Sequence, residues 1–158
     1  MEVDEKRLQS ADFSDPYYTD LPPAILVKAS NAASYKTLAD FAGKSVAAQT
    51  GTTKLDIVND QLTGANAVPL QLVTDMVNDL VNGRVDAVII DQNPAEVFNT
   101  KFEGKVKIID GAEFGFETEE YAIALPKGSE LVEQVNHALA DLKADGTFDA
   151  LVAQYIGE

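Results

Sequence analysis

The chain has 158 residues, 46% of them hydrophobic, which is enough for a compact domain with a full apolar core. Its formal net charge is −14 and its 12 Lys and Arg residues are scattered, which argues against a nucleic-acid-binding face because such a face needs clustered cations. The absence of cysteine excludes disulfides, thiolate nucleophiles and thiolate zinc sites.

Strands are predicted where short apolar runs are bounded by glycine, proline or charged residues. In chain order these runs cover residues 22–29, 44–50, 67–73, 86–91, 105–110 and 121–128. Pro69 cannot donate a hydrogen bond to a neighbouring strand, so the third strand is expected at a sheet edge. Residues 86–91 have the continuous apolar character of a strand buried on both faces, which is typical of a parallel sheet.

Helical patterns separate these strands. Ser34 is expected to cap a short helix over residues 35–41, and a second helix is expected over residues 52–62. A third helix stops at residues 82–83 and a fourth begins at Pro94. The third carries four apolar residues on one face: Met76, Val77, Leu80 and Val81. Because crossovers between parallel strands are right-handed, roughly three βα units in succession predict an open, doubly wound sheet.

The last third of the chain breaks this alternation. Two helical patterns, over residues 131–142 and 145–156, follow one another without a strand between them. The chain is therefore expected to enter the first sheet through residues 22–29, to leave it through residues 121–125, and to join a second body. One lobe is expected to be inserted within another.

Five segments carry a resemblance to a known family. In order they are RLQSADFSDPYY (7–18), FAGKSVAAQTGTT (41–53), LVNGRVDAVIID (80–91), YAIALPKGSELVEQVNHAL (121–139) and LKADGTFDALVAQY (142–155). They resemble successive signatures of the extracytoplasmic solute-binding proteins that deliver polar amino acids to ABC importers. The resemblance implies a two-lobed clamp that closes on a free amino acid, without a cofactor and in partnership with an ABC permease.

The implied fold is the α/β, type II periplasmic-binding-protein-like class, with lobe 2 complete and doubly wound and with the C-terminal part of lobe 1. Residues 1–24 are expected to be a remnant of lobe 1 with the first hinge strand. Residues 25–121 are expected to form lobe 2, and residues 122–158 the second hinge strand and the C-terminal helices of lobe 1. Family members carry some dozens of residues ahead of the segment that begins at Met1, so the resemblance implies a truncated lobe 1.

The corner formed by Gly51, Thr52 and Thr53 is the first candidate binding site. Glycine permits a sharp backbone turn, and the hydroxyl and N–H groups at the positive end of a helix dipole are suited to hold a carboxylate. The alternative is an ordinary threonine N-cap. The resemblance favours ligand binding.

Arg7 and Asp91 are the other two candidates. The resemblance implies that the Arg7 guanidinium grips the α-carboxylate of the ligand bidentately, although the nearby Glu2 would repel a carboxylate. The alternative for Arg7 is a solvated charge. Asp91 ends the predicted strand 86–91, where ligand crevices of such sheets open, and is suited to pair with an α-ammonium. Its alternative role is to cap the helix near Pro94.

No catalytic residue and no metal site is predicted. His137 is the only histidine, so no His-based triad and no two-histidine metal site can form within one chain. A dehydratase-like enzyme on the same fold is an alternative function, but the carboxylates available to it lie in no recognisable catalytic frame: Glu113, Glu117, Glu119 and Glu120.

Ligand, partners and location are expected from the same features. Lys54, if it lines the cleft, disfavours a cationic side chain, so glutamine or another neutral polar amino acid is favoured over arginine. Without the rest of lobe 1 the C-terminal helices would expose apolar faces, which predicts a homodimer formed by lobe swapping or face to face. A non-binding interaction fragment that dimerises in this way is the second alternative to the amino-acid-binding function. The segment has neither a secretory signal nor a run of about 20 apolar residues, and the resemblance implies an extracytoplasmic location for the full-length form.

Overall fold

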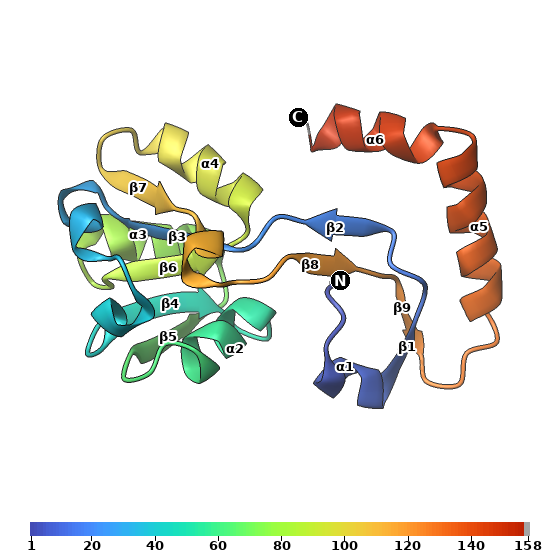
Figure 1. The fold of residues 1–158 in the computed structure, drawn as a ribbon, viewed down its shortest axis with the longest axis horizontal. Helices are drawn as coiled ribbons and strands as arrows, with labels where there is room; N and C mark the ends of the chain where they lie inside the picture. The colour runs from blue at the N-terminus through green and yellow to red at the C-terminus, as the bar shows by residue number, and fades with distance from the viewer. Residues whose placement is uncertain (157–158) are drawn as a thin grey trace. The chain divides into compact units, whose positions relative to one another are not determined.

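A computed structural model describes residues 1–156, and the chain divides into two compact units. Unit 1 combines Met1–Asp20 with the chain from Glu119 onward, and unit 2 is Leu21–Thr118 (Figure 1). Unit 2 is therefore inserted between two segments of unit 1 along the sequence. Within the described residues, none of the helices has the length and apolarity needed to cross a membrane.

Unit 2 is built on a five-stranded sheet with the order β5-β4-β6-β3-β7. Its strands are β3 (Ala24–Lys28), β4 (Ser45–Gln49), β5 (Asn66–Leu70), β6 (Ala87–Ile90) and β7 (Val106–Ile109). β4 runs parallel to β5 and β6, whereas β3 runs antiparallel to β6 and β7. The edge position of β5 confirms the expectation from Pro69, which lies in that strand.

One strand of the sheet, β3, does not follow the parallel direction that successive βα units produce. A helix joins β4 to β5, another joins β5 to β6, and a third joins β6 to β7, which keeps these four strands in one direction. β3 is instead the strand by which the chain first enters unit 2, so no crossover helix sets its direction. It lies between β6 and β7 and opposes both.

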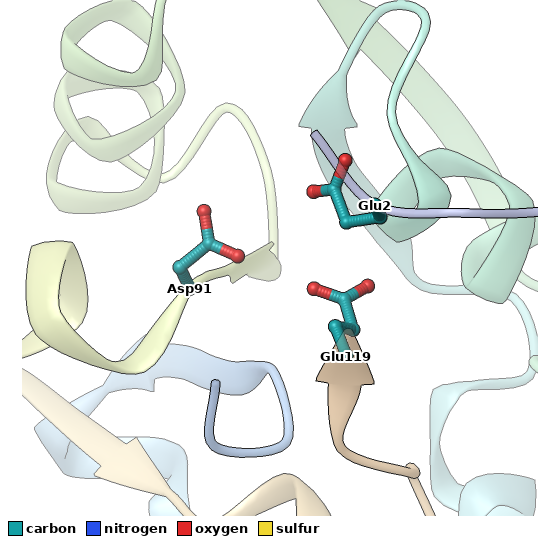
Figure 2. Close-up of side chains that lie close together, drawn as sticks. All are labelled: Glu2, Asp91 and Glu119. Atoms are coloured by element: carbon teal, nitrogen blue, oxygen red, sulfur yellow. The ribbon is translucent and has the colours of Figure 1, made fainter. Parts of the chain in front are cut away.

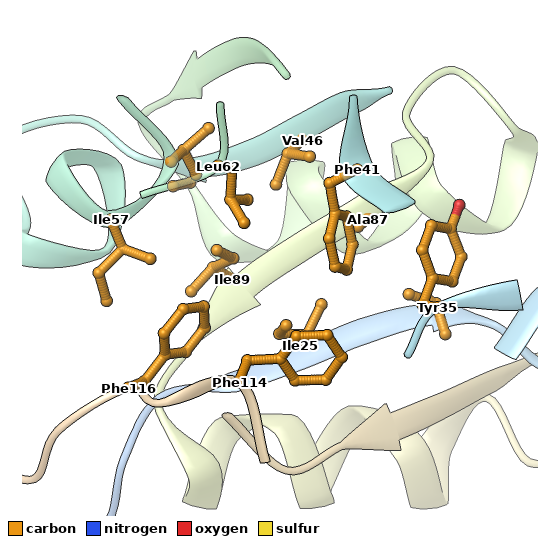
Figure 3. Close-up of a cluster of buried hydrophobic side chains, with 13 residues drawn as sticks. Ile25, Tyr35, Phe41, Val46, Ile57, Leu62, Ala87, Ile89, Phe114 and Phe116 are labelled. Atoms are coloured by element: carbon orange, nitrogen blue, oxygen red, sulfur yellow. The ribbon is translucent and has the colours of Figure 1, made fainter. Parts of the chain in front are cut away.

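Three helices flank the sheet: α2 (Thr53–Asp60), α3 (Val73–Asn82) and α4 (Gln92–Lys101). Alternate strand residues point to opposite faces, so the sheet supports two separate apolar clusters. The first packs α2 against one face and includes Ile57 and Leu62 (Figure 3). The second packs α3 and α4 against the other face and includes Met76, Leu80 and Ala95. Both faces are thus buried, as in a doubly wound sheet.

The segment between β3 and β4 differs from the expected single helix. It forms two 3₁₀ helices, η1 (Ala29–Ser34) and η2 (Leu38–Phe41), so Ser34 ends one helix and does not cap another. The Asp40 carboxylate is the cause, because it accepts hydrogen bonds from the backbone N–H groups of Lys36 (2.9 Å) and Thr37 (2.8 Å). These bonds hold an extended turn where a continuous helix was expected.

Two further element boundaries were predicted incorrectly. α4 begins at Gln92, two residues before Pro94, because the first turn of a helix has no intrahelical acceptor for its N–H groups and tolerates proline there. The strand expected over residues 121–128 is divided into β8 (Glu119–Tyr121) and β9 (Ala124–Pro126). Between them Ser14 satisfies the backbone of Ile123, since its Oγ accepts from the Ile123 N–H at 3.0 Å.

Unit 1 consists of short paired strands and three helices. β1 (Ala11–Phe13) pairs antiparallel with β9, and β2 (Tyr18–Asp20) pairs antiparallel with β8. Its helices are α1 (Glu5–Ser10), α5 (Val132–Ala144) and α6 (Thr147–Tyr155). The two consecutive C-terminal helices agree with the sequence pattern. None of the three contains a buried residue, and Ala122 is the only buried apolar residue described in unit 1.

A short 3₁₀ helix, η3 (Gly111–Phe114), completes unit 2 after β7. It directs Phe114 into the first apolar cluster, where its ring meets Phe41 edge-on with centroids 5.9 Å apart (Figure 3). The ring of Tyr35 stacks on the ring of Phe41, with their centroids 4.7 Å apart. This aromatic group belongs to the same apolar cluster as the α2 residue Ile57.

Candidate functional site

The Gly51–Thr53 corner lies where β4 passes into α2. Gly51 has a φ of +79°, in the left-handed region that disfavours residues with a Cβ, although no atom lies within 4 Å of the place a Cβ would take. Its backbone angle, and not a lack of space, therefore requires glycine. Thr52 is extended, with φ −110° and ψ 158°, so the chain turns from strand into helix over these residues.

Thr52 is the N-cap residue of α2, but its side chain makes no capping hydrogen bond within the described structure. Its Oγ1 instead donates to the Gln49 carbonyl oxygen at 2.8 Å, which fastens the corner to the end of β4. The alternative of an ordinary threonine cap is therefore wrong for the Thr52 side chain. The N-terminal end of α2 is positioned by a hydrogen bond directed backwards along the chain.

Asp91 follows directly after β6 and precedes α4 (Figure 2). It is the N-cap residue of α4, yet its side chain makes no capping hydrogen bond in the described part of the chain, which contradicts the capping alternative. Its Oδ1 instead forms an ion pair with the Nζ of Lys54 on α2. The Asp91 side chain is 35% exposed and that of Lys54 only 4%.

This ion pair brings two of the predicted segments together. β4 and β6 are neighbouring parallel strands, so their carboxyl ends meet at one edge of the sheet. The Gly51–Thr53 corner follows the first strand and Asp91 follows the second. Lys54, adjacent to the corner in sequence, contacts Asp91 directly. A positive helix end and an acidic strand end therefore share one side of unit 2.

Arg7 belongs to unit 1, in α1, and is described there with its own neighbours. Its Nη1 donates to the Glu2 carbonyl oxygen at 2.8 Å and pairs with the Glu2 carboxylate at 2.9 Å. Its Nε lies 3.1 Å from the Asp4 carboxylate. Because the side chain is only 18% exposed, the alternative of a solvated charge is wrong. Two carboxylates of its own chain accompany the guanidinium.

Glu2, expected only to repel a ligand carboxylate, is a partner of Arg7. Figure 2 also draws Glu2 and Glu119, which both belong to unit 1. His137 lies exposed on α5. Of the glutamates considered for an enzyme, Glu113 lies in η3 whereas Glu119 and Glu120 lie in β8, so they are divided between the two units.

The Lys54–Asp91 ion pair was missed by sequence reasoning, which treated Lys54 only as a cation near a cleft. A signal was present, because a lysine in the first turn of a helix opposes the helix dipole and needs another source of stabilisation. The partner could not be identified locally, since it lies 37 positions further along the chain, at residue 91 against residue 54.

Comparison with known proteins identifies relatives along the whole chain. Residues 1–158 match the family described as bacterial extracellular solute-binding proteins, family 3. The L-cystine-binding protein TcyJ of Escherichia coli (strain K12) is 31% identical over 156 residues, which are 98% of this chain and 57% of that protein. The chain therefore spans little more than half the length of this curated relative.

Solved structures match over the same extent. An ancestral arginine-binding protein bound to arginine has a TM-score of 0.88 and 35% identity, covering 99% of this chain and 69% of that one. An ancestral arginine-binding protein bound to glutamine has a TM-score of 0.87 and 36% identity, covering 100% of this chain and 69% of that one. The ancestral amino acid-binding protein AncCDT-1, a precursor of cyclohexadienyl dehydratase, has a TM-score of 0.83 and 32% identity, with coverage of 98% and 66%. The expected type II periplasmic-binding-protein fold class is confirmed.

Proposed function

The chain belongs to family 3 of the bacterial extracellular solute-binding proteins, and from this premise we propose that it binds a free polar amino acid for delivery to an ABC importer. The observation that carries the proposal is the pairing of the α2 N-terminal end with Asp91 at one edge of the unit 2 sheet, through Lys54. Relatives named for amino-acid binding support it.

In the proposed complex the ligand's carboxylate is held at Gly51, Thr52 and Thr53 and its ammonium by Asp91. The dipole at a helix N-terminus stabilises an anion by 0.3 to about 2 kcal/mol. Withdrawing both ligand charges from water is favourable only if each is paired, and this arrangement supplies one partner of each sign. Arg7 is also proposed as a ligand-binding residue, because a guanidinium can bind a carboxylate through two parallel hydrogen bonds.

Amino-acid titrations followed by ¹H–¹⁵N NMR test the proposal, since they detect binding even at millimolar dissociation constants. A polar amino acid is expected to shift the amide resonances of Gly51 and Thr53. Asp91→Asn is expected to weaken binding at least about tenfold, the scale of one lost charge-assisted hydrogen bond. Asp60→Asn, an exposed change at the far end of α2, is the control and leaves binding unchanged. Titrations in which no amino acid shifts these resonances would refute the proposal.

We further propose a neutral polar ligand such as glutamine, because Lys54 contributes a cation beside Asp91. Delivery to an ABC permease and an extracytoplasmic location for the full-length protein are proposed from the family alone.

A carrier, and not an enzyme, is proposed although AncCDT-1, described as a precursor of a dehydratase, matches with a TM-score of 0.83. A carrier returns its ligand chemically unchanged. Prolonged incubation with each amino acid that binds, followed by mass spectrometry of the recovered ligand, tests this proposal, and any turnover product would contradict it.

A homodimer through unit 1 is proposed from its exposed apolar side chains. No residue of α5 or α6 is buried, and five large apolar residues there or just beyond them are exposed: Leu131 51%, Leu142 38%, Leu151 45%, Tyr155 75% and Ile156 41%. Exposed apolar side chains are normally covered where they gather into a large patch. Sedimentation velocity is expected to give a dimer that Leu151→Glu dissociates, whereas Val97→Glu, at a 65% exposed site in unit 2, does not. A compact monomer at high micromolar concentration would contradict this proposal.

A further inference from the structure

Lys54 is the only charged residue among the buried residues of the described chain. It lies in the first turn of α2, where a cation opposes the positive end of the helix dipole. Burying an ammonium also costs free energy unless it is paired. Neither the helix dipole nor burial therefore favours lysine here, and its ion pair with Asp91 is one interaction that compensates.

The pair contributes to the charge that unit 2 presents to a ligand. Asp91 is 35% exposed, so its carboxylate remains accessible while Lys54 contacts one of its oxygens. The formal charges of the two groups sum to zero, and the α2 N-terminal end adds a partial positive charge. A zwitterionic amino acid is neutral and fits such a site, whereas an additional cation on its side chain meets the field of Lys54.

We infer that Lys54 is a specificity-determining residue, which disfavours amino acids with cationic side chains and favours those with neutral or acidic ones. The inference rests on the proposed function, because it concerns the ligand of the same site. A unit charge about 10 Å away, in an effective dielectric of about 20, changes an affinity on the order of tenfold. Removing the charge of Lys54 should therefore weaken the binding of an acidic ligand and strengthen the binding of a basic ligand, each by about that factor.

A purely structural role for the ion pair makes a different prediction. If Lys54 only fastened α2 to the end of β6, its replacement would lower the stability of the protein and would weaken the binding of every amino acid to a similar degree. A specificity role changes the ratio of affinities instead. The ratio for arginine and glutamate is the informative quantity, because these ligands share the same backbone groups and differ in the sign of the side-chain charge.

The experiment compares the wild-type chain with three variants by NMR titration with glutamine, glutamate and arginine. Lys54→Gln removes the charge, Lys54→Arg keeps it, and Lys36→Gln removes a charge from an exposed position of the same unit. The wild type is expected to bind glutamate and glutamine more tightly than arginine. Lys54→Gln should shift the arginine-to-glutamate ratio at least about tenfold toward arginine, whereas the other two variants keep the wild-type ratio.

Two results overturn the inference while leaving the proposed function intact. One is a folded Lys54→Gln variant that binds with an unchanged ratio, and the other is a wild-type chain that binds arginine more tightly than glutamate. The second result is decisive even if Lys54→Gln does not fold. Absence of binding for all three amino acids by every protein would refute the proposed function, and the inference with it.

Discussion

The energetic coupling between Lys54 and Asp91 is the most direct test of how unit 2 is held together at its proposed site. Two unit charges in contact attract by about 4 kcal/mol in an effective dielectric of about 20. Withdrawing the Lys54 ammonium, 4% exposed, from water offsets much of this attraction, and the 35% exposure of Asp91 adds solvent screening. A net coupling of about 1–2 kcal/mol is therefore expected, within the usual range for residues in contact.

A double-mutant cycle measures this coupling. Lys54→Met keeps the apolar part of the side chain and Asp91→Asn keeps the shape of the carboxylate, so both changes mainly remove charge. Lys54 makes further interactions, and each single change therefore reports more than the pair; the cycle cancels those other terms. Urea unfolding of the four proteins, followed by far-UV circular dichroism, gives the free energies of unfolding.

The double variant should be more stable than the sum of the two single changes predicts, by the coupling of about 1–2 kcal/mol. High salt should reduce the coupling only slightly, because one partner is buried and little screened. A coupling below about 0.5 kcal/mol, the usual limit of additivity, would refute the reasoning. In that case the lysine would be held at this position by something other than Asp91.

Three further predictions concern packing, backbone and pH. Phe41→Ala removes a fully buried ring and should lower the free energy of unfolding, measured by urea titration, by about 3–5 kcal/mol. Val97→Ala, at a 65% exposed site, is the control and should change that free energy by no more than about 0.5 kcal/mol. Equal losses for the two variants would contradict the burial of Phe41. Gly51→Ala should lower the free energy of unfolding by about 1 kcal/mol or more, because the φ of Gly51 is +79°, and Gly51→Asn should lower it less. An unchanged urea midpoint for Gly51→Ala would contradict this backbone strain. The hydrogen bond from Lys127 lowers the pKa of Asp12 below its ordinary value of 3.8. The contact therefore stabilises the fold fully at pH values above 3.8, and this stabilisation is lost as the pH falls through the lowered pKa of the folded state. Amide exchange of β1 should therefore accelerate in acid less in Asp12→Asn than in the wild type, and identical pH profiles would contradict the linkage.

Local sequence patterns predicted most elements of unit 2. The apolar runs identified its strands, proline placed β5 at the edge, and the spacing of Met76, Val77 and Leu80 identified the buried face of α3. Gly83, with a φ of +76°, ends α3 as expected. These features depend on residues within a few positions of one another, which is why a single sequence was sufficient.

The glycine and two threonines after β4 were likewise recognisable as the start of a helix suited to an anion. Tertiary structure determined how their side chains are used. Thr52 bonds back to Gln49, and Asp91 pairs with Lys54 although it occupies the N-cap position of α4. Arg7 was predicted as a ligand-binding residue, which stays a prediction, and its pairing with Glu2 was not foreseen.

What the sequence determined by itself was the family, the order of the elements and the identity of the candidate residues, because composition, spacing and motifs are properties of the chain as written. Tertiary structure alone decided that β3 runs against its neighbours and that Lys54 is buried against Asp91. Strand direction and ion pairing join residues that are distant in sequence. Their free energies depend on which groups the fold brings into contact and how far it removes them from water.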